Sequence, residues 1–245
     1  MAHRVEESQP TSFHRLLKAL DDRGTLVRIY TQNIDGLELK AGLSTYHRTH
    51  PQDDLQGTKC IPLHGDLQYL YCQSCHAVEA LKPHHNMLMS GRFPLCTTCK
   101  SRQDTRRESG RRVQSVPIMV PDIVLYEQQH PDAERIAEFQ TQDLSTSQPM
   151  DLLLVVGTGM HVVGTRRLIR AFAKHIRQNN PPHDALPQVI YLNLEFKQQN
   201  MFESTFDLWV QADCQLVADI ILNEMEDGKY KAIANTPDLK QLMEA

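Results

Sequence analysis

Two C-x-x-C pairs, Cys72 with Cys75 and Cys96 with Cys99, constrain this chain more than any other feature. Twenty residues separate the pairs, which is a spacing typical of four-thiolate zinc sites. Thiolates bind tetrahedral Zn²⁺ at about 2.3 Å, and each pair can supply two of them from one tight turn. Because protein ligands would fill all four positions, the metal is expected to be structural. A disulfide pair or a redox dithiol is the alternative.

Composition narrows the class of protein. The 245 residues, 40% of them hydrophobic, can bury a core as one large domain or two smaller ones. The net charge of −4 indicates that the surface as a whole is not built to bind nucleic acid. No apolar run is long enough to span a bilayer. Six cysteines, four of them in metal-ligand spacing, favour a reducing compartment, either cytoplasm or nucleus.

The segment before the cysteines is predicted to form a helix, a strand and a polar turn. Thr11 or Ser12 can cap the helix, and Gly24 stands where a helix end is expected. Residues 26–30 are predicted to form a strand, which the turn T-Q-N-I-D-G at 31–36 follows directly. The apolar stripe of the helix comprises Phe13, Leu16, Leu17 and Leu20.

The segment after the cysteines alternates between strands and helices. Residues 152–156 and 189–192 are predicted strands, and the first is followed by the turn G-T-G at 157–159. A further helix is expected from residue 217. This alternation predicts an α/β fold with a parallel sheet covered on both faces. The helix between the two strands has its apolar face at Leu168, Ile169, Phe172, Ala173 and Ile176.

Two of these turns are candidate ligand sites. A strand, a glycine turn and a helix N-terminus can bind a phosphate or ribose, but Val162 breaks the full dinucleotide fingerprint. A plain structural turn therefore explains residues 157–159 about as well as a nucleotide contact does. The polar residues 31–35 lie where open α/β folds bind ligands, although an Asx turn would also explain them. His64 alone is more often a surface or core histidine than a base.

A basic run, Lys100 to Arg112, carries six basic and two acidic residues. It could bind nucleic acid or an acidic partner, and phosphate contacts would make that binding steeply salt-dependent. A solvated or disordered loop is the favoured explanation.

Taken together and in order, the motifs resemble the sirtuin family. P-T-x-x-H-x-x-L at 10–17, Y-T-Q-N-I-D-G-L at 30–37 and L-H-G-D at 63–66 precede the two cysteine pairs. P-D-I-V-L-Y at 121–126, G-T-G-M-H-V at 157–162, N-L-E at 193–195 and A-D-C at 212–214 follow them. The resemblance covers residues 10 to about 222. Glu38 and the wording P-D-I-V-L-Y-x-x-x-H-P are most similar to the fungal nuclear branch that acts on histones.

The resemblance implies a Rossmann-like parallel sheet, expected to be incomplete at its N-terminal end in this chain, with an inserted small zinc-binding lobe. Residues 10–56 would form the first part of the NAD domain and residues 57–118 the zinc lobe. Residues 119–228 would complete the NAD domain, and 229–245 would be a C-terminal tail.

The implied activity is NAD-dependent deacylation of protein lysines. The acyl oxygen attacks C1′ of the nicotinamide ribose, nicotinamide leaves, and the acyl group ends on ADP-ribose. By similarity His64 would be the general base, a role that suits an imidazole with its ordinary pKa of about 6.5. Asn33 and Asp35 would line the nicotinamide end and are counted with His64 as catalytic. The implied NAD contacts are Gln32, Asn33, Ile34, Asp35, Gly157, Thr158, Asn193, Leu194, Glu195 and Cys214.

The chain also departs from the family pattern. The family begins with a glycine-rich loop, G-A-G-x-S, and a mobile segment ending in D-F-R, and residues 1–9 supply neither. These pieces bind the pyrophosphate, so we expect weak NAD binding from this chain alone. The family motif F-G-E is replaced by Tyr126, Glu127 and Gln128, and G-T-S ends in Gly159.

Three hypotheses follow. The first is a sirtuin-type deacetylase acting on an acetylated histone or peptide in the nucleus or cytoplasm, with NAD⁺ and one structural Zn²⁺. Its gene would encode the complete enzyme, or the chain would represent it as a fragment or from a mispredicted start. The second is a catalytically impaired or truncated sirtuin-like zinc protein that acts as a binding module. The third is a zinc-ribbon module that uses the basic run, although direct nucleic-acid binding is the less favoured outcome. No membrane partner is expected.

Overall fold

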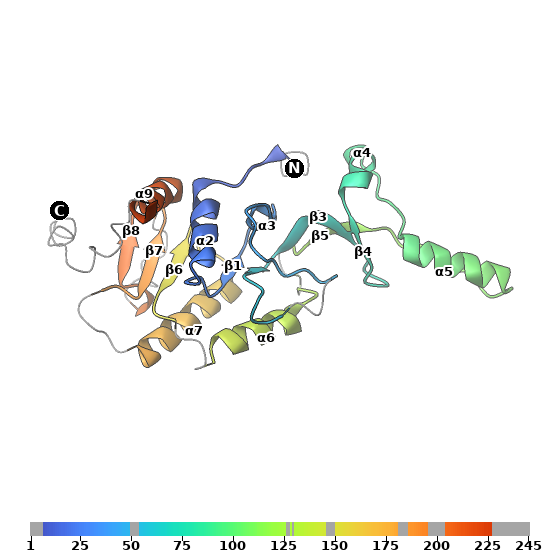
Figure 1. The fold of residues 1–245 in the computed structure, drawn as a ribbon. Coiled ribbons are helices and arrows are strands. Elements are labelled where there is room, and N and C mark those ends of the chain that lie inside the picture. Colours follow the sequence, from blue (N-terminus) through green and yellow to red (C-terminus); the bar gives the residue numbers. More distant parts are fainter. Residues whose placement is uncertain are drawn as a thin grey trace. The chain divides into compact units, whose positions relative to one another are not determined.

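The computed structural model describes residues 7–49, 54–125, 128, 130–145, 150–180, 186–195 and 204–226. The chain forms two compact units, shown as ribbons in Figure 1. Unit 1 comprises residues 1–10 and 28–140, and unit 2 comprises residues 11–27 and 141–245. The four-part domain division stays a prediction, and its tail at 229–245 lies outside the described residues.

A two-stranded parallel sheet forms one part of unit 1. β1 (Ile29–Thr31) pairs with β2 (Cys60–Pro62), and the short helix α3 (Leu37–Lys40) follows β1. The helix α6 (Ala133–Asp143) covers the pair, because its apolar side chains cluster with the fully buried Ile61. The strand predicted at 26–30 is therefore present, but it starts later and is shorter.

An antiparallel sheet forms the centre of the cysteine-containing lobe of unit 1. β3 (Gly65–Tyr71) lies between β4 (Val78–Ala80) and β5 (Val120–Ile123). Two short helical segments, η1 (Lys82–His84) and α4 (His85–Met89), follow β4. Leu70, Leu81 and Met119 are buried around three of the cysteines. The sequence showed no clear strand pattern here, so these strands were not predicted.

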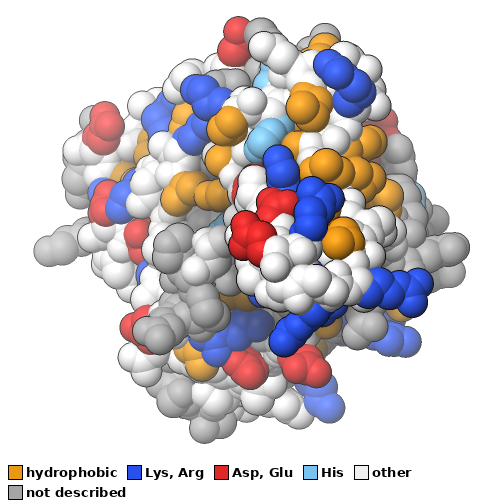
Figure 2. All heavy atoms as spheres, turned by 90° about the vertical axis from the view of Figure 1, so that its right-hand side faces the viewer, with side chains coloured by type: hydrophobic (Ala, Val, Ile, Leu, Met, Phe, Trp, Pro, Cys, Tyr) orange, Lys and Arg blue, Asp and Glu red, His pale blue; other side chains and the backbone are white. Residues whose placement is uncertain are grey.

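The basic run is a helix, and the prediction of a loop was wrong. α5 (Thr97–Glu108) contains most of the run and extends away from the three strands (Figure 1). Arg, Lys, Gln and Glu are good helix formers, and the N-cap Cys96 accepts a hydrogen bond from the Cys99 N–H through its sulfur. Figure 2 views this side of the molecule and shows Lys and Arg side chains beside exposed hydrophobic ones.

A three-stranded parallel sheet forms the centre of unit 2. β6 (Leu153–Val156) pairs with β7 (Val189–Leu192), which pairs with β8 (Leu208–Val210). The amphipathic helix α7 (Val163–Asn179) packs buried Ile169 and Ala173 against the sheet. The predictions of β6, α7 and β7 are confirmed, whereas β8 was not predicted.

Two helices complete the described part of unit 2. α2 (Ser12–Asp22) has Thr11 as its N-cap and ends before Gly24, whose φ of +70° is the left-handed conformation expected there. It packs against α9 (Cys214–Glu226) through buried Leu16. The predicted first helix is confirmed. No helix among the described residues is both long enough and apolar enough to cross a membrane.

Truncating Leu16 tests the α2–α9 packing. Its side chain is 2% exposed, so we expect Leu16→Ala to lower the free energy of unfolding by about 2–4 kcal/mol. The matched control is Leu216→Ala on α9, because Leu216 is 59% exposed and should cost no more than about 0.5 kcal/mol. Trp209, the single tryptophan, reports on unit 2 in denaturant titrations followed by fluorescence. Equal losses in the two variants would show that this interface is not packed as described.

Candidate active site and metal centre

The pairing of β1 with β2 brings several predicted site residues of unit 1 to one edge. Thr31 lies opposite Pro62, and the N–H of Leu63 donates to the carbonyl of Thr31 at 2.8 Å. The strands are parallel, so the loop 32–35 and His64 both follow strand ends at the same carboxyl edge. Open α/β folds bind their ligands at this kind of edge.

The backbone around His64 is tightly specified. The N–H of Val124 donates to the carbonyl of His64 at 2.9 Å. Gly65 has a φ of +83°, and a Cβ at this position would lie 2.2 Å from the carbonyl oxygen of Asp122. Only glycine fits both the conformation and the space. The H-G pair therefore fixes the half-buried His64 where β5 meets β3.

The loop after β1 has the hydrogen bonds of an Asx-type turn. The N–H of Asn33 donates to Oγ1 of Thr31, and the N–H of Leu37 donates to Oδ1 of Asp35, both at 3.1 Å. The carbonyl of Ile34 accepts from the N–H of Leu67 at 2.9 Å, which ties the loop to β3. Asn33 remains exposed and Gln32 half-buried. The Asx-turn explanation of this loop therefore agrees with the structure. The ligand roles of Gln32, Asn33, Ile34 and Asp35 stay predictions.

Two buried carboxylates near this edge were not singled out from the sequence. Asp66 on β3 lies opposite Asp122 on β5. The pKa of each is raised to about 6, mainly by burial, and for Asp66 the nearby carboxylates Asp122 and Glu38 contribute to that rise. Asp66 belongs to the L-H-G-D motif, but nothing in the motif indicated that its side chain would be buried.

His130 is a second histidine close to His64 that the sequence did not assign to the site. Its Nδ1 accepts from the N–H of Asp132 at 3.0 Å. Burial lowers the pKa of His130, and the nearby charges of Arg48 and His64 lower it further. His130 is therefore expected to be neutral. The only sequence signal for His130 was its position in the motif P-D-I-V-L-Y-x-x-x-H-P.

The predicted site residues of unit 2 lie together at another carboxyl edge. Gly157 and Thr158 follow β6, and residues 193–195 follow β7. Cys214 opens α9 shortly after β8. Gly157 has a φ of +64°, and its N–H donates to the carbonyl of Leu192 at 3.0 Å, which joins the first two turns. The contacts proposed for Gly157, Thr158, Asn193, Leu194, Glu195 and Cys214 stay predictions.

Asn193 organises this second edge. Its amide Nδ2 donates to the hydroxyl of Tyr191 at 2.6 Å and to the carbonyl of Thr158 at 3.3 Å. Its own carbonyl accepts from Nε1 of Trp209 at 3.1 Å. Asn193 therefore holds the turns after β6 and β7 together through its side chain.

The departures from the family pattern are partly described. Tyr126 and Glu127 lie outside the described residues. A Cβ on Gly159 would lie 2.7 Å from Nε2 of His161, so a larger residue at 159 would require that ring to move.

The four cysteines form a geometry that fits zinc. All four sulfurs lie within 4.8 Å of one another, with Cys75 to Cys96 at 3.5 Å and Cys72 to Cys99 at 4.0 Å. A tetrahedral ion with bonds of about 2.3 Å requires sulfurs about 3.8 Å apart. No disulfide joins them, so the disulfide alternative is not what these residues form. The donor set and its burial match a structural zinc site.

Backbone hydrogen bonds fix the position of each cysteine pair. In the first knuckle the N–H of Cys72 donates to the carbonyl of Ala77, and the N–H of His76 donates to the carbonyl of Cys72, both at 2.9 Å. His76 has a φ of +61°, which closes the turn. In the second, Cys96 caps α5 and its N–H donates to the carbonyl of Pro117. The turn after β3 therefore supplies the first pair of thiols, and the start of α5, tied to the segment before β5, supplies the second.

Comparison with known proteins gives the family. The Sir2 family model matches residues 1–164. NAD-dependent protein deacetylase hst4 of Emericella nidulans is 33% identical over 236 residues, which cover 95% of this chain and 38% of that protein. NAD-dependent histone deacetylase HST3 of Saccharomyces cerevisiae is 30% identical over 245 residues, covering 97% of this chain and 53% of that protein. The chain belongs to the Sir2 family, and its similarity to these fungal proteins agrees with the branch that the motifs suggested.

Solved structures confirm the fold class. The structure titled "Sir2 bound to acetylated peptide" matches 91% of this chain and 73% of that chain, with a TM-score of 0.59 and 22% identity. The predicted Rossmann-like α/β fold with a zinc-binding lobe is therefore confirmed. The chain spans 38% and 53% of the lengths of the two relatives named above.

Removing one zinc ligand tests the metal centre. We expect Cys96→Ser to lose the bound zinc, about one ion per chain, and to unfold the lobe, because binding of a structural zinc is coupled to folding. Elemental analysis and circular dichroism measure the two effects. Cys214→Ser is the control, since Cys214 lies outside the four-sulfur cluster and its loss should leave the zinc content unchanged. Full zinc content in Cys96→Ser would remove Cys96 from the ligand set.

The buried carboxylate Asp66 gives a pH test. Its pKa is about 6 in the folded protein against an ordinary value of 3.8, so the folded state keeps a proton that the unfolded chain has lost. This group's contribution to the free energy of unfolding is present below about pH 4 and is lost as pH rises to about 6. Asp66→Asn abolishes the loss and can still accept the hydrogen bond from the N–H of Gln68. Its stability relative to wild type should therefore be about 1 kcal/mol more favourable at about pH 7 than at about pH 5.

The control for this test is Asp104→Asn, because Asp104 is exposed on α5. Chemical denaturation of the three proteins at both pH values gives the comparison. A difference between Asp66→Asn and wild type that does not change with pH would show that Asp66 is ionised in the folded protein at both.

Proposed function

We propose that this protein is an NAD-dependent protein-lysine deacetylase of the sirtuin type. The observation that carries the proposal is the convergence of His64 and the loop 32–35 on one carboxyl edge of unit 1, in a chain that belongs to the Sir2 family. The relatives are named NAD-dependent deacetylases, and a neighbouring fold is titled as bound to an acetylated peptide. These facts support the same activity for this chain.

In this proposal NAD⁺ is a consumed substrate and His64 is the general base. The acetyl oxygen of the lysine displaces nicotinamide from C1′ of the ribose, and His64 takes a proton from a ribose hydroxyl. The deprotonated ribose hydroxyl then attacks the carbon of the resulting imidate, the lysine amine leaves, and one water molecule is consumed to give O-acetyl-ADP-ribose. An imidazole is suited to this step because its ordinary pKa lies near working pH.

The remaining roles are divided between the two edges. Gln32 would hold the ribose, and Asn33, Ile34 and Asp35 would line the nicotinamide end. Gly157 and Thr158 would approach the adenosine half, with Asn193, Leu194 and Glu195 at its ribose and Cys214 at the adenine. The four-cysteine site would hold one zinc ion, which stabilises the lobe and takes no part in proton transfer.

We further propose that the substrate is an acetylated histone and that the protein works in the nucleus. The support is that several relatives are named histone deacetylases, including HST3 and HST4 of Saccharomyces cerevisiae.

The His64→Ala variant of the full-length protein tests the activity. Loss of the base should lower the rate of nicotinamide release from an acetylated histone peptide by at least about 100-fold. Its zinc content should stay unchanged, because His64 lies outside the cysteine cluster. His175→Ala is the matched control, since His175 lies near the C-terminal end of α7, where it hydrogen bonds to Asn179, and belongs to none of the predicted site residues.

Two results would count against the proposal. Retained turnover in His64→Ala would exclude His64 as the base. No turnover by the wild-type protein, with zinc bound and no NAD⁺ binding in a calorimetric titration, would instead favour the alternative of a catalytically impaired binding module.

A further inference from the structure

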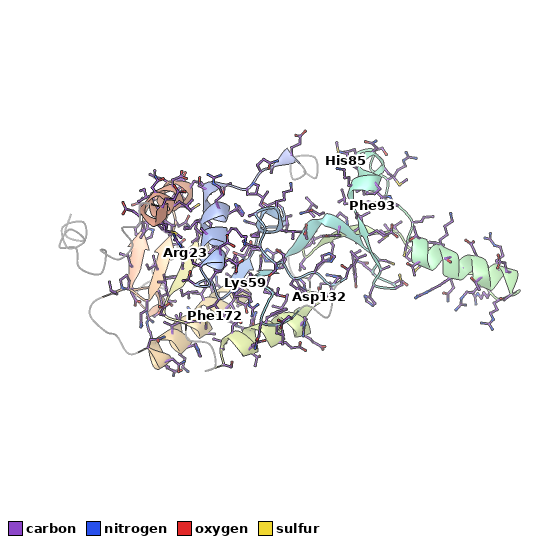
Figure 3. All side chains as sticks on the ribbon, in the orientation of Figure 1. Arg23, Lys59, His85, Phe93, Asp132 and Phe172 are labelled. Carbon is purple, nitrogen blue, oxygen red and sulfur yellow. The ribbon has the colours of Figure 1, made fainter. Side chains whose placement is uncertain are left out.

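Arg48 holds two carboxylates from separate parts of unit 1. Its Nη2 lies 2.9 Å from Oδ1 of Asp122 on β5, and its Nε lies 3.3 Å from Oδ2 of Asp132, the residue before α6. Its guanidinium carbon lies 4.4 Å from the centre of the Tyr71 ring on β3. The side chain is only 10% exposed. Asp132 is labelled in Figure 3, beside α6.

The two carboxylates mark the two ends of the connection between β5 and α6. At the first end, the N–H of Val124 donates to the carbonyl of His64. At the second end, the N–H of Asp132 donates to Nδ1 of His130. Arg48 therefore fixes both ends of this connection, and the first of them is hydrogen-bonded to the candidate base itself.

This arrangement needs an arginine. The side chains of Asp122 and Asp132 are only 8% and 18% exposed, and the charge of Asp132 raises the pKa of Asp122. Their repulsion is relieved by a cation that reaches both at once. The guanidinium is planar and presents several N–H donors in a rigid fork, whereas a lysine ammonium is a single point charge on a flexible stem. Lysine at this position would keep the charge but could not hold both ends in place.

We propose that Arg48 is a positioning residue that fixes the β5–α6 connection at both ends and thereby sets the placement of His64. The inference rests on the proposed function in one respect, namely that His64 acts as the base. It assigns Arg48 no contact with substrate. The expected signature is a loss of turnover without a loss of binding at the unit 2 edge, where Gly157 and Asn193 lie.

The test compares Arg48→Lys with Arg15→Lys in the full-length protein. Arg15 forms an exposed ion pair with Asp219 at 3.9 Å, so this control makes the same replacement at a solvent-screened site. Arg48→Lys should lower kcat for an acetylated histone peptide by about tenfold, because small displacements of a catalytic group are costly. Its zinc content and its Kd for ADP-ribose should stay within about twofold of wild type, as should every parameter of Arg15→Lys.

A double-mutant cycle identifies the coupling. Asp132→Asn should reproduce the loss in kcat, and adding it to Arg48→Lys should cost little more, because the two residues act as one unit. Unchanged kcat in Arg48→Lys would overturn the proposal. So would additive effects in the cycle, or an equal loss of kcat and ADP-ribose binding, which would indicate general destabilisation.

Hydrogen exchange separates this proposal from the proposed function. Loss of the contacts from Arg48 to Asp122 and Asp132 should speed hydrogen exchange of the Val124 amide in Arg48→Lys, whether or not the protein is active. Faster exchange in a protein with no measurable turnover would support the structural role of Arg48 and count against the deacetylase assignment. Unchanged exchange of the Val124 amide would overturn the proposal that Arg48 fixes the β5–α6 connection.

Discussion

The contact between Gly65 and the backbone of Asp122 is the constraint on which unit 1 depends. It allows β5 to lie directly against the turn that carries His64, and β3 begins at Gly65 and runs to Tyr71. Cys72, the first predicted zinc ligand, follows at once. The candidate base and the metal centre thus lie at opposite ends of one strand of seven residues, roughly 20 Å apart at the usual rise. At that distance the zinc can organise the strand but cannot take part in proton transfer at His64.

Buried charge is the second feature that organises unit 1. Glu38, Asp66 and Asp122 are all buried near the edge that carries His64. Burying several carboxylates together is costly unless they are neutralised or paired. Both solutions are present: Asp66 keeps a proton to higher pH, and Asp122 is paired with Arg48. The geometry around the candidate base therefore depends on electrostatics as well as on apolar packing.

The sequence predicted the elements whose signals are local. The apolar stripe of α2 and its cap at Thr11 identified that helix, and the strand–turn–helix pattern identified β6 and α7. Cysteine spacing indicated the metal site because each pair is closed by its own short turn. The strands of the zinc lobe were missed because β4 and β5 are only three and four residues long and the buried positions of β3 do not alternate. The helix α5 was mistaken for a loop because it has no apolar face to reveal its period.

The electrostatic part of the site could not be predicted for a different reason. Arg48 lies far along the chain from Asp122 and Asp132, and nothing local in any of the three indicates a shared contact. The burial of Asp66 likewise depends on which strand lies opposite β3. Such pairs are set by the tertiary fold, so they cannot be predicted from a single sequence.

Structural and ligand-binding roles need not exclude each other at the two carboxyl edges. Asp35 and Asn193 both bond to nearby protein groups, which by itself would explain their side chains. Those bonds also fix the turns before a ligand arrives, so less conformational freedom is lost on binding. Replacing either residue would therefore disturb the fold and the binding together. Asn33 differs, because it is exposed and its side chain makes no hydrogen bond within the described part of the chain. A loss of affinity at Asn33 would report on the ligand alone, which makes it the cleanest position at which to distinguish the two roles.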